Sequence, residues 1–467
     1  MKLLAVFLLY ASIREAIAVT TNREQRRDTA AFDPSRYDSS DIIYRDVAVI
    51  GGGSTGTYGA IKLRDMGKSV VLVEKEQVLG GHENTYIDPT TGTPIDFGVQ
   101  AYWNIPVVTD FFARFNISIG PYGFSGYSTT FADFTTGQTI PNFTLNYNLL
   151  TAYNDQLNKY PDLSWSWNLP SPIPDDLLMP FGQFIEKYSL QDSAYALWTI
   201  TGGVTNPFLL DQVTVNVMKW LDHAYMDETI NGNAVTTTKH DNGELYVKAL
   251  AELGSDALLS STVTAAQRPE EGGVSLVVST PKGDKLIVAS KLLITIPLLV
   301  GNMKPFDVDD TEENLFKKFH YSCYYVGLVN NTGFPGGYRY LNAAANDTYN
   351  IPHFPGLYFI NPTIEKGIYL YWYGSLTDLT QEEIESDVAT VIHRLSNSTQ
   401  EPNFLAFASH TPFKLEVTAD DITNGFYDQL YALQGHRDTW YTGAAMISHN
   451  AGVLWNFTQA LLPRIVA

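Results

Sequence analysis

Three glycines at the spacing G-x-G-x-x-G are the clearest candidates for chemistry in this chain, because together they could hold a diphosphate through backbone amides. Gly51 would permit a tight turn, Gly53 would let a phosphate approach the backbone, and Gly56 would let a helix pack closely. A helix that begins at Ser54 and Thr55 would point free N–H groups and its positive dipole end at the anion. The spacing therefore predicts a dinucleotide-binding loop.

An acidic residue follows at the distance that dinucleotide binding requires. Glu74 lies roughly twenty residues after the glycines, where its carboxylate could accept hydrogen bonds from a ribose diol. A carboxylate there would repel a 2′-phosphate, which disfavours NADP. Lys75 follows directly and is a second candidate contact. The alternative is a glycine turn in an unrelated α/β domain.

The flanking elements decide between these alternatives. Residues 46–50 are apolar and β-branched, as is typical of a buried parallel strand. A helix is predicted over 54–66, and a second strand over 69–73 ends at Glu74. A glycine motif between a strand and a helix, inside a βαβ unit of about 30 residues, is the context that dinucleotide binding needs. The predicted fold class is therefore α/β with a Rossmann-type domain.

The residues after this unit carry a family resemblance. Together with the glycine motif and Glu74, Gly80-Gly81 and Asp96-Phe97-Gly98 resemble the N-terminal block of flavin-containing amine oxidases and phytoene-desaturase-like enzymes. Gly80-Gly81-His82-Glu83-Asn84-Thr85 is similar to a branch that includes fungal secreted flavoproteins such as β-cyclopiazonate dehydrogenase. Amine oxidases usually carry Gly-Gly-Arg, so His82 is a departure that puts amine oxidation in doubt. The resemblance implies FAD as the cofactor and a glutathione-reductase-like fold.

Two later blocks extend this resemblance. The segment 242–253 leads into a strand over 261–266, which implies that Val263 contacts the adenine. Residues 292–297 are similar to the family's strand that ends in a proline. Residues 439–444 resemble the second flavin motif, with Gly443 and Met446 as implied contacts and Ala444 in place of the usual acid. The last helix, opened by residues 448–452, would point its positive dipole end at the flavin.

These blocks imply a discontinuous FAD-binding domain over 44–105, 235–305 and 431–467. An interleaved α+β substrate domain would take 106–234 and 306–430. In that domain the residue pattern predicts helices over 175–187 and 214–226, and strands over 321–330 and 368–373.

Candidate catalytic residues come from the segments that the resemblance places near the flavin. They are Gln100, Tyr102, Trp440, Tyr441 and His449, with Val99 and Gln100 also implied as cofactor contacts. Simple core packing is an equal alternative for Trp103, Trp440 and Tyr441, and helix capping is the alternative for His449. Amine oxidases often use a lysine near flavin N5, and the comparable strand, 321–326, contains none. Lys317 and Lys318 precede it and are expected to face solvent.

These observations lead to a prediction of a FAD-dependent oxidoreductase that transfers hydride from a small hydrophobic metabolite to flavin N5, as in oxidative cyclisation or desaturation. One alternative is a double-bond isomerase; the others are an amine oxidase or a non-catalytic flavin-fold binding protein. O2 is one candidate electron acceptor, and nothing in the sequence fixes an oligomeric state. The net charge of −20 argues against nucleic acid and anionic membranes as partners.

The N-terminus predicts secretion. Lys2, an apolar run and Ala16-Ile17-Ala18 are typical of a signal peptide over 1–18. That run is shorter than the ~20 residues of a membrane anchor. A polar or pro-segment over 19–43 contains Arg26-Arg27, a hypothetical processing site. Asn-x-Ser/Thr sequons predict a glycoprotein and occur at Asn116, Asn142, Asn330, Asn346, Asn397 and Asn456. The single Cys323 is expected to be a buried structural thiol, and no residue spacing predicts a metal site.

Overall fold

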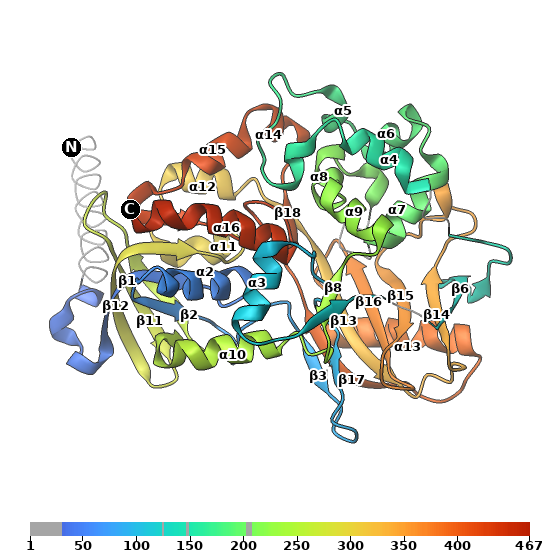
Figure 1. Cartoon of the computed structure of the whole chain (residues 1–467), viewed down its shortest axis with the longest axis horizontal. Coiled ribbons are helices and arrows are strands. Elements are labelled where there is room, and N and C mark those ends of the chain that lie inside the picture. Colours follow the sequence, from blue (N-terminus) through green and yellow to red (C-terminus); the bar gives the residue numbers. More distant parts are fainter. Residues whose placement is uncertain (1–29, 124–125, 146–148, 202–207) are drawn as a thin grey trace, which may run out of the picture.

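The computed structural model of the chain describes residues 30–123, 126–145, 149–201 and 208–467. The expected signal peptide and the Arg26-Arg27 pair lie outside these residues. Two lobes lie side by side, each built around one large sheet (Figure 1). No helix in the described ranges is long and apolar enough to cross a bilayer.

The first sheet has seven strands, in the order β10-β11-β12-β1-β2-β9 with β19 paired to β12. β1 is parallel to both β12 and β2, and its last residues, Val47 to Ile50, are buried. Burial on both faces explains why this strand reads as a continuous apolar run. The strands are β1 (Ile42–Ile50), β2 (Val70–Val73), β9 (Ala257–Leu258), β10 (Thr262–Gln267), β11 (Val274–Thr280), β12 (Gly283–Ile294) and β19 (Thr439–Tyr441).

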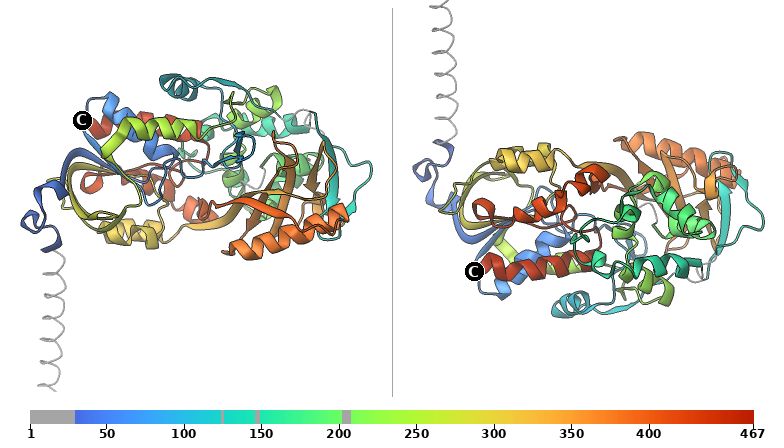
Figure 2. Two further views of the ribbon diagram at one scale, coloured as in Figure 1. Left: turned by 90° about the horizontal axis from the view of Figure 1, so that it is seen from below. Right: turned by 90° about the horizontal axis from the view of Figure 1, so that it is seen from above.

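Helices cover both sides of this sheet. One side carries α2 (Ser54–Asp65), α3 (Pro106–Arg114), α10 (Glu244–Leu253) and α16 (Ala451–Val466). The other side carries α11 (Val300–Met303), α12 (Asp310–Phe316) and α15 (Phe426–Ala432) (Figure 2). This arrangement confirms the predicted α/β, Rossmann-type fold class. β1 starts earlier than expected, because Ile42 to Arg45 pair with Leu286 to Ala289 of β12. The end of the segment expected to be a polar or pro-segment, residues 42–43, is therefore part of the sheet.

The second sheet has eight strands, in the order β17-β13-β16-β15-β14-β6-β7 with β18 paired to β13. They are β6 (Ser128–Asp133), β7 (Gln138–Thr139), β13 (His320–Asn330), β14 (Tyr338–Asn342), β15 (Gly356–Pro362), β16 (Tyr369–Ser375), β17 (Asn403–Ser409) and β18 (Phe413–Glu416). The helix α13 (Gln381–Ser396) covers one face with Ile384, Val388 and Ile392. Cys323 is buried there, and burial raises the pKa of its thiol to about 11, as suits a structural role.

A cluster of short helices covers the other face of the second sheet (Figures 1 and 2). They are α4 (Leu150–Leu157), α5 (Asp175–Leu178), α6 (Phe181–Lys187), α7 (Ala194–Thr201), α8 (Thr214–Trp220) and α9 (His223–Asn231). Two predictions of single helices, over 175–187 and 214–226, are wrong. Pro180 separates α5 from α6, because proline cannot donate the hydrogen bond that a continuing helix needs. Asp222 ends the other segment, since its side chain caps the new helix α9 at Tyr225 N.

Candidate active site

The glycine loop between β1 and α2 is shaped by close packing at two of its glycines. A Cβ on Gly56 would lie 1.8 Å from Gly51 O, and one on Gly52 would lie 2.4 Å from the Leu79 side chain. A Cβ on Gly53 would meet nothing closer than Gly81 Cα, at 3.8 Å. The protein's own packing therefore requires no side chain at Gly52 or Gly56, whereas the bare backbone at Gly53 leaves room for a ligand.

The start of α2 is available to an anion. Gly53 is its N-cap residue and supplies no side-chain acceptor, whereas α12, α13 and α16 are capped by Asp309, Thr380 and Asn450. Trp455 of α16 fixes the position of this helix end, because its Nε1–H donates to Ser54 Oγ at 3.0 Å. The uncapped N–H groups of a fixed helix start are a suitable site for a diphosphate.

Glu74 lies at the carboxyl end of β2, directly beside the glycine loop. Its carboxylate is buried and accepts hydrogen bonds from Gly52 N at 2.5 Å and Glu76 N at 2.8 Å. A carboxylate offers about four acceptor positions, so capacity remains for a ribose diol. Ser261 N donates to Glu74 O at 2.8 Å, which brings the start of β10, with the buried Val263, to the same edge. Lys75, by contrast, is exposed and paired with Glu76.

The Gly80-Gly81-His82 segment lies against the glycine loop from the opposite side. Gly80 N donates to Gly52 O at 2.9 Å, and Gly80 forms a parallel bridge with Gly53. His82 is an exposed residue by its surface area, yet the residues packed around its ring lower its pKa to about 4. Its ring stacks on His410, so His82 lies between the glycine loop and the second lobe.

The two residues after His82 hold it in place. Glu83 accepts a hydrogen bond from the Tyr102 hydroxyl at 2.6 Å, and both side chains are buried. Asn84 Oδ1 lies 2.8 Å from Nε2 of His410, a residue of the second lobe. The Tyr102 hydroxyl is therefore committed to positioning this loop.

Aromatic side chains from both lobes form one wall around His82. Its ring stacks on His410 with centroids 4.3 Å apart and an interplanar angle of 10°, and the Phe413 ring lies 5.7 Å away. Phe413 also contacts His449, at 4.3 Å, and Tyr324, at 5.0 Å. Burial lowers the pKa of His410 well below its usual value and that of His449 to about 3. The wall is thus aromatic and uncharged at neutral pH.

The segment 96–103 is tied to the chain before α10. Asp96 accepts hydrogen bonds from the Thr85 hydroxyl at 2.5 Å and from Asn242 N at 3.0 Å, and burial raises its pKa to about 7. Asn242 Nδ2 donates to Val99 O at 3.1 Å. Gln100 is half-buried and receives a hydrogen bond from the Tyr122 hydroxyl at 3.1 Å. Trp103 is buried and packs edge-on against Trp165.

The second expected flavin motif follows β19. Gly443 has φ +105°, and a Cβ there would lie 2.9 Å from Thr295 O, so only glycine lets this turn pass the end of β12. Met446 is buried after the turn, and the half-buried His449 precedes α16. The cap of α16 is Asn450, not His449. Among the catalytic candidates, His449 contacts the wall around His82 through Phe413.

Trp440 and Tyr441 lie elsewhere. The Trp440 ring packs under the Arg464 guanidinium, 5.0 Å from its centroid. The Tyr441 hydroxyl joins a fully buried ion pair in which Arg268 Nη1 and Nη2 lie 2.8 and 2.5 Å from Glu312. Both side chains thus have structural partners within the first lobe.

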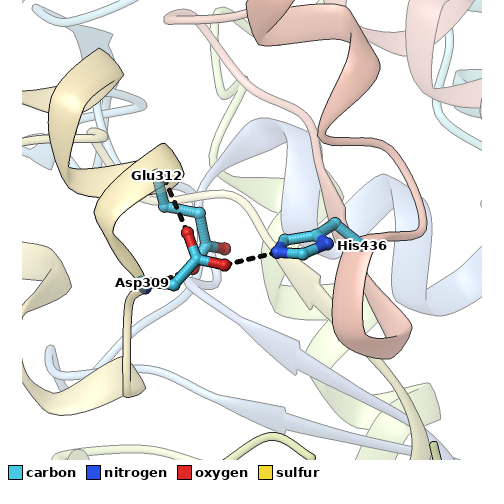
Figure 3. Close-up of side chains that lie close together, drawn as sticks. All are labelled: Asp309, Glu312 and His436. Carbon is cyan, nitrogen blue, oxygen red and sulfur yellow. Dashed lines mark hydrogen bonds and ion pairs between the residues drawn. The ribbon is translucent and has the colours of Figure 1, made fainter. Parts of the chain in front are cut away.

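Asp309, Glu312 and His436 lie close enough together to suggest a metal site (Figure 3). Their acceptor oxygens already have partners, however. Glu312 binds Arg268 and the Asp309 amide, and Asp309 caps α12 while its second oxygen lies 2.6 Å from His436 Nε2. The chemistry of this cluster is that of a helix cap and a buried ion pair.

Sequence reasoning missed two buried lysines. Lys414 of β18 lies 2.6 Å from Gln212 Oε1 and 2.7 Å from Glu416 Oε1. Lys219 of α8 donates to Ser166 O at 2.8 Å and lies over the Trp167 ring. Burial lowers the pKa of both, that of Lys219 to about 7. Their isolated positions gave no signal, because only the fold brings them together with residues 444–449.

Comparison with known proteins agrees with this geometry. Residues 49–115 match a family of NAD(P)-binding Rossmann-like domains. The chain is 42% identical to the FAD-dependent oxidoreductase dbaF of Emericella nidulans, over 94% of each chain. It is 33% identical to β-cyclopiazonate dehydrogenase of Aspergillus oryzae, over 92% of this chain and 95% of that protein. The chain belongs to this family of FAD-dependent oxidoreductases.

Solved structures show the same fold. A fatty acid isomerase from P. acnes that produces CLA superposes with a TM-score of 0.73 at 18% identity, covering 92% of this chain and all of that one. A putrescine oxidase superposes with a TM-score of 0.65 at 13% identity, covering 91% and 99%. The relatives named above confirm the predicted family resemblance and FAD as the cofactor, and these solved structures agree with the predicted fold.

The observed groups fit FAD. The bare backbone at Gly53 and the uncapped start of α2 suit the diphosphate, and Glu74 suits the ribose. His82 and the turn at Gly443 border the space left for the ring system. We assign the cofactor-binding role to these residues as a proposal that the chain's own geometry supports.

Proposed function

We propose that this oxidoreductase removes a hydride from a C–H bond of a small, hydrophobic organic molecule in the space between its two lobes. The observation that carries the proposal is the uncharged aromatic wall formed by His82, His410 and Phe413 where the lobes meet. Burial keeps these imidazoles neutral. A neutral aromatic surface favours an apolar substrate over a cationic amine, which agrees with His82 in place of the arginine of amine oxidases.

The residues of this chain would bind the substrate, orient it and shield it from water. FAD supplies the hydride acceptor when it is bound. The aromatic wall would exclude water and hold the substrate against the cofactor space. Glu83, Asn84 and His410 hold His82 through the hydrogen bonds described above. Burial lowers the pKa of His449 to about 3, so its imidazole stays neutral and borders the site as an uncharged ring.

The test is the visible spectrum of the purified protein under anaerobic conditions. We expect a flavin band that is bleached by a hydrophobic substrate and restored by an electron acceptor, with O2 among those tried. A substrate that is turned over without acceptor consumption would instead establish a double-bond isomerase. A protein that stays colourless after incubation with FAD would overturn the proposal.

We also propose that the protein is secreted and glycosylated. The signal-like segment over 1–18 and six sequons support this proposal. Five of the asparagines are exposed on the described surface, Asn116, Asn142, Asn346, Asn397 and Asn456, and Asn330 is half-buried. Asn456 lies on α16, so its use also requires that the helix tolerate a glycan. Expression in a eukaryotic host should yield medium-borne protein whose mass falls on N-glycosidase treatment; retention of unmodified protein inside the cells would contradict this.

A further inference from the structure

A small cavity lies where α8, β18 and the loop before α16 meet. It measures about 30 Å³, and its lining includes Asn216, Trp220, Lys219, Lys414 and His449. By the usual criterion, roughly 10–15 Å³ per water-sized atom, this is room for about two oxygen atoms. The cavity adjoins the aromatic wall, because His449 packs against Phe413 and Phe413 packs against His82.

Four buried polar atoms of the lining have no hydrogen-bond partner among the described residues. They are Asn216 Oδ1, Trp220 Nε1, Glu416 Oε1 and His449 Nε2. Asn216 is only 3% exposed, so solvent does not satisfy it. A buried polar group without a partner is destabilising, and a polar ligand bound in this cavity would supply the missing hydrogen bonds.

The lining offers more donors than acceptors. The Lys414 ammonium has three N–H groups, of which Gln212 Oε1 accepts one, and Glu416 Oε1 lies 2.7 Å from its nitrogen as an ion-pair partner. The Lys219 ammonium gives two of its three to the carbonyls of Leu163 and Ser166. The Trp220 indole adds one N–H donor, for which the described residues supply no acceptor. The group that best matches this set is therefore a pair of oxygens that accept several hydrogen bonds.

The backbone at Lys414 shows that this placement carries strain. Lys414 has φ +52°, a left-handed conformation that side chains other than glycine rarely adopt. The neighbouring residue Phe413 is part of the aromatic wall, and the Lys414 side chain lines the cavity. Strain of this kind is concentrated at functional sites.

We propose that this cavity is a substrate subsite that binds a carboxylate group. The proposal rests on the proposed function, because it places the apolar body of the same substrate along the aromatic wall. The substrate would then be an amphipathic acid: apolar where the hydride leaves, and anionic at the Lys414 end. The subsite orients the molecule and takes no part in bond making.

The experiment titrates the FAD-loaded enzyme with benzoate and with neutral benzamide. Binding is read from the shift of the flavin visible spectrum. We expect benzoate to bind at least ten times more tightly than benzamide. Lys414→Met should weaken anion binding at least ten-fold, and Trp220→Phe, which removes a single N–H, should weaken it several-fold. The exposed Lys317→Met is the matched control and should bind as the wild type does.

Failure of this proposal is separable from failure of the proposed function. A normal flavin spectrum with equal affinity for benzoate and benzamide would mean that the cavity holds water only, and would overturn the subsite. The same conclusion follows if benzoate does not bind, or if Trp220→Phe binds benzoate as well as the wild type does. A second measurement, the melting temperature and FAD content of Lys414→Met, shows whether that variant is folded.

Discussion

At the scale of single residues, Gly53 and Gly56 of the same loop differ in whether the protein's own packing leaves room for a side chain. A Cβ on Gly53 has no protein atom closer than 3.8 Å, and its φ of −65° suits any residue. We expect Gly53→Ala to fold with a melting temperature close to that of the apo wild type and to bind FAD at least ten-fold more weakly, about 1.4 kcal/mol. FAD content and a fluorescence titration of the apoprotein measure this.

The matched variant is Gly56→Ala. Its Cβ would lie 1.8 Å from Gly51 O, so the loop or the helix must shift. We expect a lower melting temperature for this apoprotein, by an amount in the range of overpacking, about 1–3 kcal/mol. If Gly53→Ala binds FAD as the wild type does, the diphosphate does not lie at this loop.

Asp96 predicts a pH dependence of stability. Burial raises the pKa of this carboxyl from 3.8 to about 7. Between these values the unfolded chain has lost its proton and the folded protein keeps it, so stability falls as the pH rises from about 4 to 7. Asp96→Asn should flatten this dependence because an amide does not titrate, and its oxygen can still accept hydrogen bonds from Thr85 and Asn242. Urea unfolding at several pH values checks it.

The exposed Asp110→Asn is the control for Asp96 and should retain the wild-type slope. An unchanged slope in Asp96→Asn would show that other groups set the pH dependence. His82 contributes in the opposite direction, since burial lowers its pKa from 6.5 to about 4 and stability is lost as the pH falls through that range. The two effects can be separated only by variants.

The site residues that could be predicted from the sequence are those that lie close to one another along the chain. Gly51, Gly53, Gly56 and Glu74 lie within one βαβ unit, so their spacing alone brings them to one edge of a sheet. Lys414 could not be found in this way. Its position depends on the pairing of Phe413 with Ser322 across two distant segments, and on a left-handed turn that no local pattern signals.

At the scale of elements, the central strands and α2 follow their sequence patterns closely, and the helical cluster does not. Apolar periodicity continued through 175–187 and 214–226, but the local breaks at Pro180 and Asp222 decided where the helices end. The capping aspartate could have been recognised from sequence, since it is a preferred N-cap residue. Which apolar faces meet which sheet depended on tertiary packing.

The buried pair of Arg268 and Glu312 joins β10 to α12, and Tyr441 adds β19 to the same contact. Both charged side chains are fully buried. Arg268→Met leaves the Glu312 carboxylate with only the more distant Arg437, at 4.0 Å, so we expect a loss of about 3–5 kcal/mol in the free energy of unfolding. Urea denaturation measures the loss.

Two further variants control this prediction. The double variant Arg268→Met/Glu312→Leu removes both charges and should recover part of the lost stability. Arg114→Met breaks the partly exposed pairs with Asp65 and Glu252 and should cost only about 0–1 kcal/mol. A loss in Arg268→Met no larger than that in Arg114→Met would refute a central role for the buried pair.

At the scale of the whole molecule, the chain runs back and forth between the two sheets. β1 and β2 lie in the first, β6 and β7 in the second, β9 to β12 in the first, β13 to β18 in the second, and β19 in the first again. One hydrophobic core cluster contains residues of both lobes. Neither lobe is therefore a continuous segment. The chain segments that build one lobe are connected through the other lobe.

We therefore expect the protein to unfold in one transition, although it has two lobes. Two independent lobes would unfold in two transitions. Here the chain passes repeatedly between the two sheets, so unfolding of one lobe disrupts the other. Tryptophan fluorescence and far-UV circular dichroism should report the same midpoint, with and without FAD. Saturating FAD, at about 100 times its Kd, should add about 2.7 kcal/mol and move both signals together. Two resolved calorimetric peaks, of which FAD shifts only one, would show that the lobes unfold independently despite their interleaved strands.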